Sequence, residues 1–563
     1  MAAEEEEEER GGKGPLEAET RPLKKQQEEE GAVAGAASEG GARRGPGGKG
    51  GRLSRWRTAA FFVSLFLCLA AVFAFSFVIP CPVRPVSQRA WSRAFAGAAA
   101  YQSLQVQDVD QDRVQDVLFA FRASGGTHNS TNRSCSGEGF PPPCAFVAAV
   151  SGTDGSTLWE EPVAEDLQFM DCSFQYGDSP GCLVVGKPAS LAAIDLKTGN
   201  TVWRVTTNLG MNSTVLSPLL IVPDVNGDGV SDLLVFAAVG GEIQSGFYSG
   251  MSGEAIGSGG SLRLPGRRGH LMQVTKTGAH YVLFYTANAL YGYSLKQLYA
   301  VAAGSEGQGG ASLKEDPQWQ TAIDEATHYV PLLSSGEIRY LMKVPGRSGT
   351  DILLVRSATL ELLDGQRLGS MWTSDVMPPI QSKPVLGSFT PDEVDIVIES
   401  SVTLYRKKVL IVEGSSGSIQ WELDLLLGAG TPAPGTLPTA DHRSLFLFWG
   451  DYQPGHNGTG SEGPPQNLYL FHPSFPNVLL WMNNSTEAIV AFQVVLFERS
   501  RHACYVLLTG PQTDSGPGLV VLSKRKLKED MAGSHVIWLN QLAQDSEQNI
   551  RDRFLRMRYR SPW

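Results

Sequence analysis

The chain has 563 residues, of which 42% are hydrophobic and 19% charged, and its formal net charge is −11. This hydrophobic content excludes a wholly disordered chain, the negative charge argues against a nucleic-acid binder, and the 7 cysteines are too few for a disulfide-built scaffold. The 62 glycines and 33 prolines exclude a long helical bundle and favour turn-rich β structure.

The first segment, residues 1–58, has almost no large apolar residues. It opens with the glutamates Glu4 to Glu9 and later becomes rich in Gly, Arg and Lys. Such a composition cannot bury a core, so we expect a disordered tail.

Residues 59–79 are expected to form a transmembrane signal-anchor helix. The segment carries no charged residue, and at about 1.5 Å per residue it would reach about 31 Å, enough to cross a bilayer core of about 30 Å. More Arg and Lys residues precede it than follow it, which places the N-terminal tail in the cytosol. Residues 80–100 would then form a juxtamembrane stalk.

Potential N-glycosylation triplets support the same orientation. All of them follow the predicted anchor, at Asn129, Asn132, Asn212, Asn457, Asn483 and Asn484. The sequence therefore predicts a single-pass type II membrane glycoprotein whose C-terminal part is extracellular or lumenal, with the cell surface as the favoured location.

Six cysteines follow the anchor, as expected for an oxidising compartment. Two pairs are close enough in the chain to clip local loops, Cys135 with Cys144 and Cys172 with Cys182. Cys81 has two alternatives: a bond to Cys504, or a bridge to a second chain in a disulfide-linked dimer.

A short phrase recurs in the remaining chain: a strand, a small turn with Gly, and a strand ending in Trp. It occurs as VSGTDGSTLW (Val150–Trp159), IDLKTGNTVW (Ile194–Trp203), LLDGQRLGSMW (Leu362–Trp372) and VEGSSGSIQW (Val412–Trp421). A weaker copy without Trp is YSGMSGEAIG (Tyr248–Gly257). The spacing matches one propeller blade of about 40–50 residues, and each Trp can pack between neighbouring blades.

We therefore predict an all-β fold in which residues 101–543 form a seven- or eight-bladed β-propeller; an array of β-sandwiches is the alternative. Residues 544–563 are basic and have apolar residues at helical spacing. They are expected to form a C-terminal helix that caps the propeller, or else a tail that binds a partner.

Two acidic loops have the pattern of a calcium site. DVNGDGVSD and DVDQDRVQD place acidic or amide side chains at positions 1, 3, 5 and 9 and a carbonyl at position 7, all oxygen ligands that suit Ca²⁺. The predicted ligands are Asp224, Asn226, Asp228, Val230 and Asp232 in one loop, and Asp108, Asp110, Asp112, Val114 and Asp116 in the other. Arg113 replaces the second glycine of the tight turn, which makes that turn costlier.

Two further segments keep only part of this pattern. VPGRSGTDILLV retains Asp351 before its strand, and FTPDEVDIVI retains Asp392 and Asp395. We expect these blades to be held by turns alone.

The loop-then-strand units resemble the FG-GAP repeats of integrin-α propellers, although the FG and GAP tripeptides are not intact. With the anchor, AVSGTDGSTLWE, LPTADHRSLFLFWG and IRDRFLRMRY, they resemble the integrin-alpha FG-GAP-repeat-containing family, also called family with sequence similarity 234. The resemblance covers the chain beyond about residue 50. It implies a type II membrane protein with a propeller ectodomain and a poorly defined molecular role.

The motifs favour a binding module over an enzyme. HExxH and GxxxxGK[ST] are absent from the sequence, and Asp441–His442 is the only suggestive acid–histidine pair. The hairpin phrase also resembles quinone-dependent dehydrogenases, but the adjacent cysteines expected of those enzymes are missing. We expect a non-catalytic module that presents its propeller to an unidentified partner protein; a lumenal chaperone or cargo receptor of the ER or Golgi is the alternative.

Overall fold

The computed structural model describes residues 52–78, 90–126, 133–177, 179–207, 213–264, 266–303, 313–346, 349–377, 379–380, 382–403, 406–426, 431–453, 466–498, 501–540 and 545–561. Most of the predicted tail, as well as Cys81, Asn129, Asn132, Asn212 and Asn457, lies outside these ranges. The chain divides into two compact units, Met1–Val83 and Arg84–Trp563.

The first unit contains helix α1 (Arg52–Val78), which covers nearly all of the predicted anchor. Phe61 and Phe66 are examples of its exposed large apolar side chains. Across the described residues, no helix combines the length and the apolar character that crossing a membrane requires.

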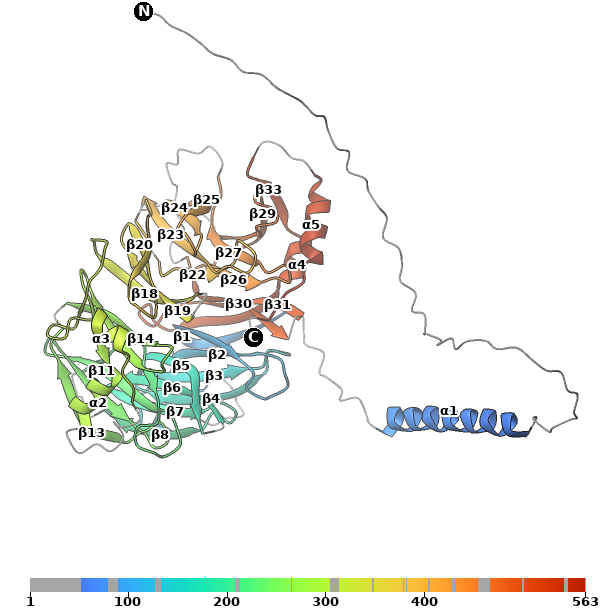
Figure 1. Ribbon diagram of the computed structural model, residues 1–563, viewed down its shortest axis with the longest axis horizontal. Helices are drawn as coiled ribbons and strands as arrows, with labels where there is room; N and C mark the ends of the chain where they lie inside the picture. Colours follow the sequence, from blue (N-terminus) through green and yellow to red (C-terminus); the bar gives the residue numbers. More distant parts are fainter. Residues whose placement is uncertain are drawn as a thin grey trace, which may run out of the picture. The chain divides into compact units, whose positions relative to one another are not determined.

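The second unit is built almost entirely of antiparallel sheets that follow one another in chain order (Figure 1). We call the successive sheets blades 1 to 8. Blade 1 contains the second half of β1 (Trp91–Gln107) with β2 (Asp116–Ala123), β3 (Cys144–Val150) and β4 (Thr157–Ala164), and blade 2 contains β5 (Asp166–Tyr176), β6 (Ser179–Lys187), β7 (Ser190–Asp195) and β8 (Thr201–Thr206). Blade 3 contains β9 (Thr214–Val215), β10 (Leu220–Val222), β11 (Asp232–Val239), β12 (Glu242–Tyr248) and β13 (Ala255–Leu262). Blade 4 contains β14 (Arg267–Val274), β15 (His280–Thr286), β16 (Leu290–Ser294) and β17 (Tyr329–Val330).

Blade 5 contains β18 (Ile338–Gly346), β19 (Gly349–Arg356), β20 (Thr359–Leu363) and β21 (Ser370–Asp375), and blade 6 contains β22 (Val385–Gly387), β23 (Asp395–Thr403), β24 (Arg406–Val412) and β25 (Ile419–Leu426). Blade 7 contains β26 (Gly435–Pro438), β27 (Ser444–Gly450), β28 (Gln466–Phe471), β29 (Val478–Ser485) and β33 (His535–Trp538). Blade 8 contains β30 (Ile489–Glu498), β31 (Arg501–Thr509), β32 (Gly518–Lys526) and the first half of β1. The short helices are η1 (Cys135–Glu138), α2 (Leu295–Ala303), α3 (Pro317–Ala322), α4 (Leu527–Ala532) and α5 (Glu547–Arg556).

The core is divided into eight apolar clusters, each between two consecutive blades. Because successive side chains of a strand point to opposite faces, each strand contributes to two clusters. In β2, Phe119 and Phe121 pack against blade 8, whereas Leu118 and Ala120 pack against blade 2. The last cluster joins blade 8 back to blade 1, so the sheets form a closed eight-bladed propeller, in agreement with the predicted fold.

The ring is closed by β1, which belongs to two blades. Its residues Trp91–Ala98 pair with β32 of blade 8, and Ala99–Gln107 pair with β2 of blade 1. Figure 1 shows this strand, in blue, beside the red strands of blade 8. The propeller therefore begins at Trp91, and the predicted stalk boundary at residue 100 is wrong. The Ala-rich stretch lacked the Val and Ile expected of a strand, but its small side chains fit between closely packed blades.

The recurrent Trp side chains join neighbouring blades, as predicted. The indole Nε1–H of Trp159 donates to the Leu196 carbonyl at 2.9 Å, and that of Trp203 donates to the Gly250 carbonyl at 3.0 Å. Trp91, which the repeat pattern did not include, makes the same contact with the Gly152 carbonyl at 3.2 Å. Further examples are Trp372 to Gly414 and Trp421 to Pro476.

Both local disulfides are present, Cys135–Cys144 and Cys172–Cys182. Cys504 is a free, buried thiol in the seam between blades 8 and 1. Burial raises its pKa to about 12, so it stays protonated and unreactive at neutral pH. Cys81 lies outside the described residues, so its pairing stays a prediction.

The C-terminal segment caps the propeller. Ile550 and Phe554 of α5 are buried against blades 7 and 8, and Tyr559 forms an antiparallel bridge with Thr439 of blade 7. In the described part of residues 544–563, the chain therefore forms a helix that packs on the propeller.

A buried histidine in blade 7 leads to a pH-dependent prediction. His472 Nδ1 accepts the Ser474 backbone N–H at 3.2 Å, and burial lowers the His472 pKa to about 4. Because the unfolded chain binds this proton near pH 6.5, the stability contributed by neutral His472 is lost as the pH falls from about 6.5 to 4, by up to about 3 kcal/mol.

We expect His472→Gln to flatten this acid limb in urea unfolding measured from pH 7 to pH 4, relative to the wild-type chain. His535→Gln, at an exposed position, should keep the wild-type slope. An unchanged slope in His472→Gln would contradict the assignment.

Candidate calcium loops

The two acidic loops occupy equivalent places in the propeller. Residues 108–116 connect β1 to β2 in blade 1, and residues 224–232 connect β10 to β11 in blade 3. In the strand orders β1-β2-β3-β4 and β10-β11-β12-β13, each loop joins the first strand to the second, so both loops lie at the same end of the ring.

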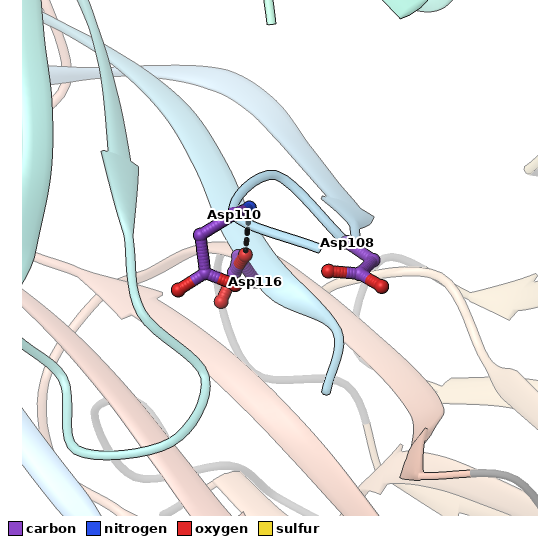
Figure 2. A group of neighbouring side chains, drawn as sticks. All are labelled: Asp108, Asp110 and Asp116. Carbon is purple, nitrogen blue, oxygen red and sulfur yellow. Dashed lines mark hydrogen bonds between the residues drawn. The ribbon is translucent and has the colours of Figure 1, made fainter. Parts of the chain in front are cut away.

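In the blade 1 loop, carboxylate oxygens of Asp108, Asp110 and Asp116 lie within 4.8 Å of one another. Figure 2 shows these residues on one turn of the chain, with the Asp110 backbone N–H donating to Asp116. Asp112 is not in this group; its carboxylate accepts from the Val114 N–H at 2.7 Å and from the Thr153 hydroxyl at 2.9 Å.

In the blade 3 loop, Asp224, Asp228 and Asp232 form the corresponding group. The Asp224 carboxylate accepts the backbone N–H groups of Gly227 and Gly229 at 2.6 and 2.8 Å. Asn226 lies beside the group, since its side-chain Nδ2 donates to Asp228 Oδ2 at 2.9 Å. The two predicted carbonyl ligands, at Val114 and Val230, stay predictions.

Both loops have the same backbone conformation despite different sequences. Gly227 and Gly229 have φ of 82° and 86°, and Gln111 and Arg113 have φ of 64° and 72° at the matching positions. Residues other than Gly rarely adopt this left-handed backbone conformation, which costs on the order of 1 kcal/mol for each such residue. The blade 1 loop therefore holds a strained turn at two positions, of which the sequence indicated only Arg113.

The last aspartate of each loop has a structural role that sequence reasoning missed. Asp116 is fully buried and accepts the N–H groups of Val109 and Gly152 at 2.8 Å; Asp232 does the same with Val225 and Gly250. The partial copies keep this contact, Asp351 with Gly365 and Asp395 with Gly414. The shared signal was the glycine that follows the first strand in four of the hairpin phrases, whose backbone N–H donates to the buried aspartate of the same blade.

These hairpin glycines cannot be replaced without moving the backbone. A Cβ on Gly152 would lie 1.7 Å from the Gln115 carbonyl oxygen, and one on Gly414 would lie 1.9 Å from that of Val394. Loop, buried aspartate and hairpin therefore form one unit in four blades, and among the described residues three clustered carboxylates are found in two of those four.

The donor set of the blade 1 loop fits a hard cation. Asp108 Oδ1 is buried and has no hydrogen-bond partner, so one acceptor lacks the donor that a buried oxygen normally has. Burial raises the pKa of Asp116 to about 7, and burial also raises the pKa of Asp108 and Asp110. A divalent ion would favour the ionised form of all three.

The suggestive Asp441–His442 pair does not form a catalytic unit. His442 Nδ1 lies 2.5 Å from Asp392 Oδ1 and 3.0 Å from Arg560 Nη1, and the His442 side chain is exposed. Asp441 instead accepts from the hydroxyl of Thr439 at 2.6 Å. In the described residues these side chains join blades 6 and 7 to the C-terminal segment.

Comparison with known proteins agrees with the resemblance inferred from the sequence. A family model described as the FAM234A/B beta-propeller matches residues 91–560. Protein FAM234A of Homo sapiens is 45% identical over 515 residues, covering 91% of this chain and 92% of that protein. Protein FAM234B of Homo sapiens is 30% identical over 495 residues, covering 84% and 77%.

Among solved structures, the Dos1 propeller matches with a TM-score of 0.43 and 10% identity, covering 77% of this chain and 94% of that chain. The family assignment rests on the family model and on the two relatives, and FAM234A is the more similar of these. The chain belongs to the FAM234A/B β-propeller family.

Proposed function

We propose that this protein is a non-catalytic, single-pass type II membrane glycoprotein whose propeller binds partner proteins at the cell surface or in the secretory pathway. The observation that carries the proposal is the closed ring of eight interlocked blades, because a rigid ring holds many loops in fixed positions at each end. The charge-free segment 59–79, the glycan triplets after it and the two disulfides support the orientation and the oxidising compartment.

We further propose that Ca²⁺ stabilises the ectodomain through the loops of blades 1 and 3. Asp108, Asp110 and Asp116 would hold one ion, and Asp224, Asp228 and Asp232 the other, with Asp112 and Asn226 beside them. The bound ion supplies positive charge to clustered carboxylates. The chain contributes the turns that bring these carboxylates together and the hairpins that hold them.

We expect Asp228→Ala and chelation to lower the thermal midpoint of the purified ectodomain. Extracellular module sites bind at about 10⁻⁴–10⁻³ M, so 1 mM Ca²⁺ would stabilise the protein by about 0.4–1.4 kcal/mol for each site. Differential scanning fluorimetry with Ca²⁺ or EDTA measures the change. Glu254→Ala, an exposed acidic residue in the hairpin of the same blade, should keep the full response. Equal midpoints in Ca²⁺ and EDTA for the wild-type protein would refute the calcium proposal.

The binding role and the location require a separate test. A biotin ligase fused to the C-terminus of the full chain should label a reproducible set of extracellular or lumenal proteins, and surface biotinylation should reach the ectodomain in intact cells. Glycans that all stay sensitive to endoglycosidase H, without surface labelling, would place the protein in the early secretory pathway as a chaperone or cargo receptor. Labelling of cytosolic proteins alone would overturn the proposed orientation.

A further inference from the structure

The C-terminal cap, which consists of α5 and residues 557–560, is rich in basic side chains. From Ile550 to Arg560 the sequence contains five arginines and one aspartate, although the whole chain has a net charge of −11. Helix α4 contacts α5, as Figure 1 shows in red, and it adds Lys528, with Lys526 directly before it. The cap and α4 therefore form a positive region on a protein that is acidic as a whole.

Packing brings α4 and the end of the chain together. Phe554 of α5 and Tyr559 belong to the same apolar cluster as the buried side chains of α4. Lys528 Nζ lies over the Tyr559 ring, 5.8 Å from its centroid. The Arg558 carbonyl accepts the Ala440 N–H at 2.8 Å, which fixes this part of the chain on blade 7. The lysines at α4 and the arginines at the end of α5 therefore share one area of the surface.

Only some of the basic side chains in this area have an acidic partner. Three arginines make ion pairs at 2.9 to 3.1 Å: Arg525 with Asp530, Arg551 with Glu547, and Arg553 with Asp545. The described residues contain no ion pair for the four basic side chains that we call the basic patch, Lys526, Lys528, Arg556 and Arg558. Both arginines of the basic patch are exposed, and both lysines are partly exposed.

The basic patch keeps an excess of positive charge when its acidic neighbour is counted. Glu529 follows Lys528 in α4 and lines, with Lys526, a groove of about 530 Å³ between blades 7 and 8. It offsets at most one of the four positive charges. Burial lowers the pKa of Lys528, and the charges of Lys526 and Arg558 lower it further, as expected where like charges gather.

The basic patch offers charge without an apolar anchor. Among the described residues from Val520 to Ser561, no large apolar side chain is exposed. The centre of a protein–protein interface is usually held by buried aromatic or apolar side chains. A sulfated polysaccharide, in contrast, is a chain of negative groups that clustered Lys and Arg side chains attract electrostatically. Anionic lipid is concentrated in the cytosolic leaflet, on the opposite side of the membrane from the propeller in the proposed orientation.

We propose that the basic patch binds the sulfate groups of sulfated polysaccharide chains. The inference rests on the proposed function, because it requires the propeller to lie on the extracellular or lumenal side. The lysines and arginines of the basic patch would each face a sulfate, and Arg side chains can donate two parallel hydrogen bonds to such an oxyanion. Salt would screen this attraction, since most of these side chains stay in contact with water.

The test uses residues 84–563 as a secreted protein, because Arg84–Trp563 is one compact unit and contains all eight blades. This choice also removes the Lys and Arg residues of the N-terminal tail, which would bind a polyanion by themselves. The probes are a heparin octasaccharide and the same octasaccharide after chemical desulfation. Their affinities are measured by microscale thermophoresis at low and at physiological salt.

Three double variants separate the basic patch from general charge. Arg556→Gln/Arg558→Gln removes two charges from the basic patch, and Arg556→Lys/Arg558→Lys keeps them. Lys197→Gln/Arg367→Gln is the matched control, because it removes two exposed charges on blades 2 and 5. Thermal midpoints of all variants verify that the propeller stays folded.

We expect the sulfated probe to bind the wild-type protein more weakly as salt rises, and the desulfated probe to bind at least about tenfold more weakly. Arg556→Gln/Arg558→Gln should lose about tenfold or more in affinity at an unchanged thermal midpoint, because half of the cations of the basic patch are gone. The Lys variant and the control variant should keep most of the wild-type affinity.

A smaller loss in the Gln variant, an equal loss in the control or the Lys variant, or equal affinity for both probes would overturn the inference. Absence of binding, or binding to phosphatidylserine vesicles in place of heparin, would also overturn it. None of these results changes the proposed orientation or the binding of partner proteins, which surface biotinylation and proximity labelling test separately.

Discussion

Lys407→Met is expected to destabilise the propeller by about 3–5 kcal/mol, because it leaves a buried carboxylate without its counter-charge. The Lys407 side chain is fully buried in β24, and its Nζ lies 2.6 Å from Glu399 Oε1 on the neighbouring strand β23. Glu399 Oε2 also accepts from the Ser382 hydroxyl at 3.2 Å. Urea unfolding followed by intrinsic fluorescence measures the loss.

The double variant Lys407→Met/Glu399→Leu is the matched control. It removes both charges, and replacing a buried pair by apolar residues is often neutral or stabilising. We therefore expect the double variant to recover most of the stability that the single variant loses. If both variants lost the same stability, the cost would come from packing and not from the unpaired charge.

Phe95→Ala is expected to destabilise the ring closure by about 3–5 kcal/mol. Phe95 is 3% exposed and lies in the first half of β1, where its ring packs against Phe119 and Phe121 with centroid distances of 5.0 and 5.5 Å. The substitution leaves a cavity in the cluster between blades 8 and 1, so the strand that closes the ring loses its main apolar contact.

Hydrogen exchange separates local opening from global unfolding. In Phe95→Ala we expect faster exchange first in β1 and β32, which pair at the seam. Leu519→Ala on β32 serves as the control, because Leu519 is 55% exposed and its truncation should change stability by less than about 0.5 kcal/mol. Uniform acceleration over all eight blades would contradict a local role for Phe95.

Much of the fold could be predicted because it depends on local patterns. The Gly-turn-Trp phrase predicted hairpins and contacts between blades, and Trp159 and Trp203 make the contacts expected. Cys135–Cys144 was predictable because few residues separate the two cysteines. The acidic loops were recognised from side chains at fixed spacing within nine residues, and three carboxylates of each loop do converge.

What could not be predicted depends on contacts between distant segments. The pairing of Trp91 with Lys524 joins the two ends of the propeller, and no local pattern announces it. The contact of Asp116 with Gly152 crosses 36 residues.

The closing strand has a consequence for the order of events during synthesis. The first half of β1 is made at the start of the propeller, but its partner β32 is made more than four hundred residues later. Until then β1 exposes an edge that can pair with other chains, and blade 8 cannot be completed. This pairing has a very high contact order, so we expect ring closure to be a late and slow step in folding. A nascent chain of this protein should therefore depend on protection of its N-terminal strand for most of its translation.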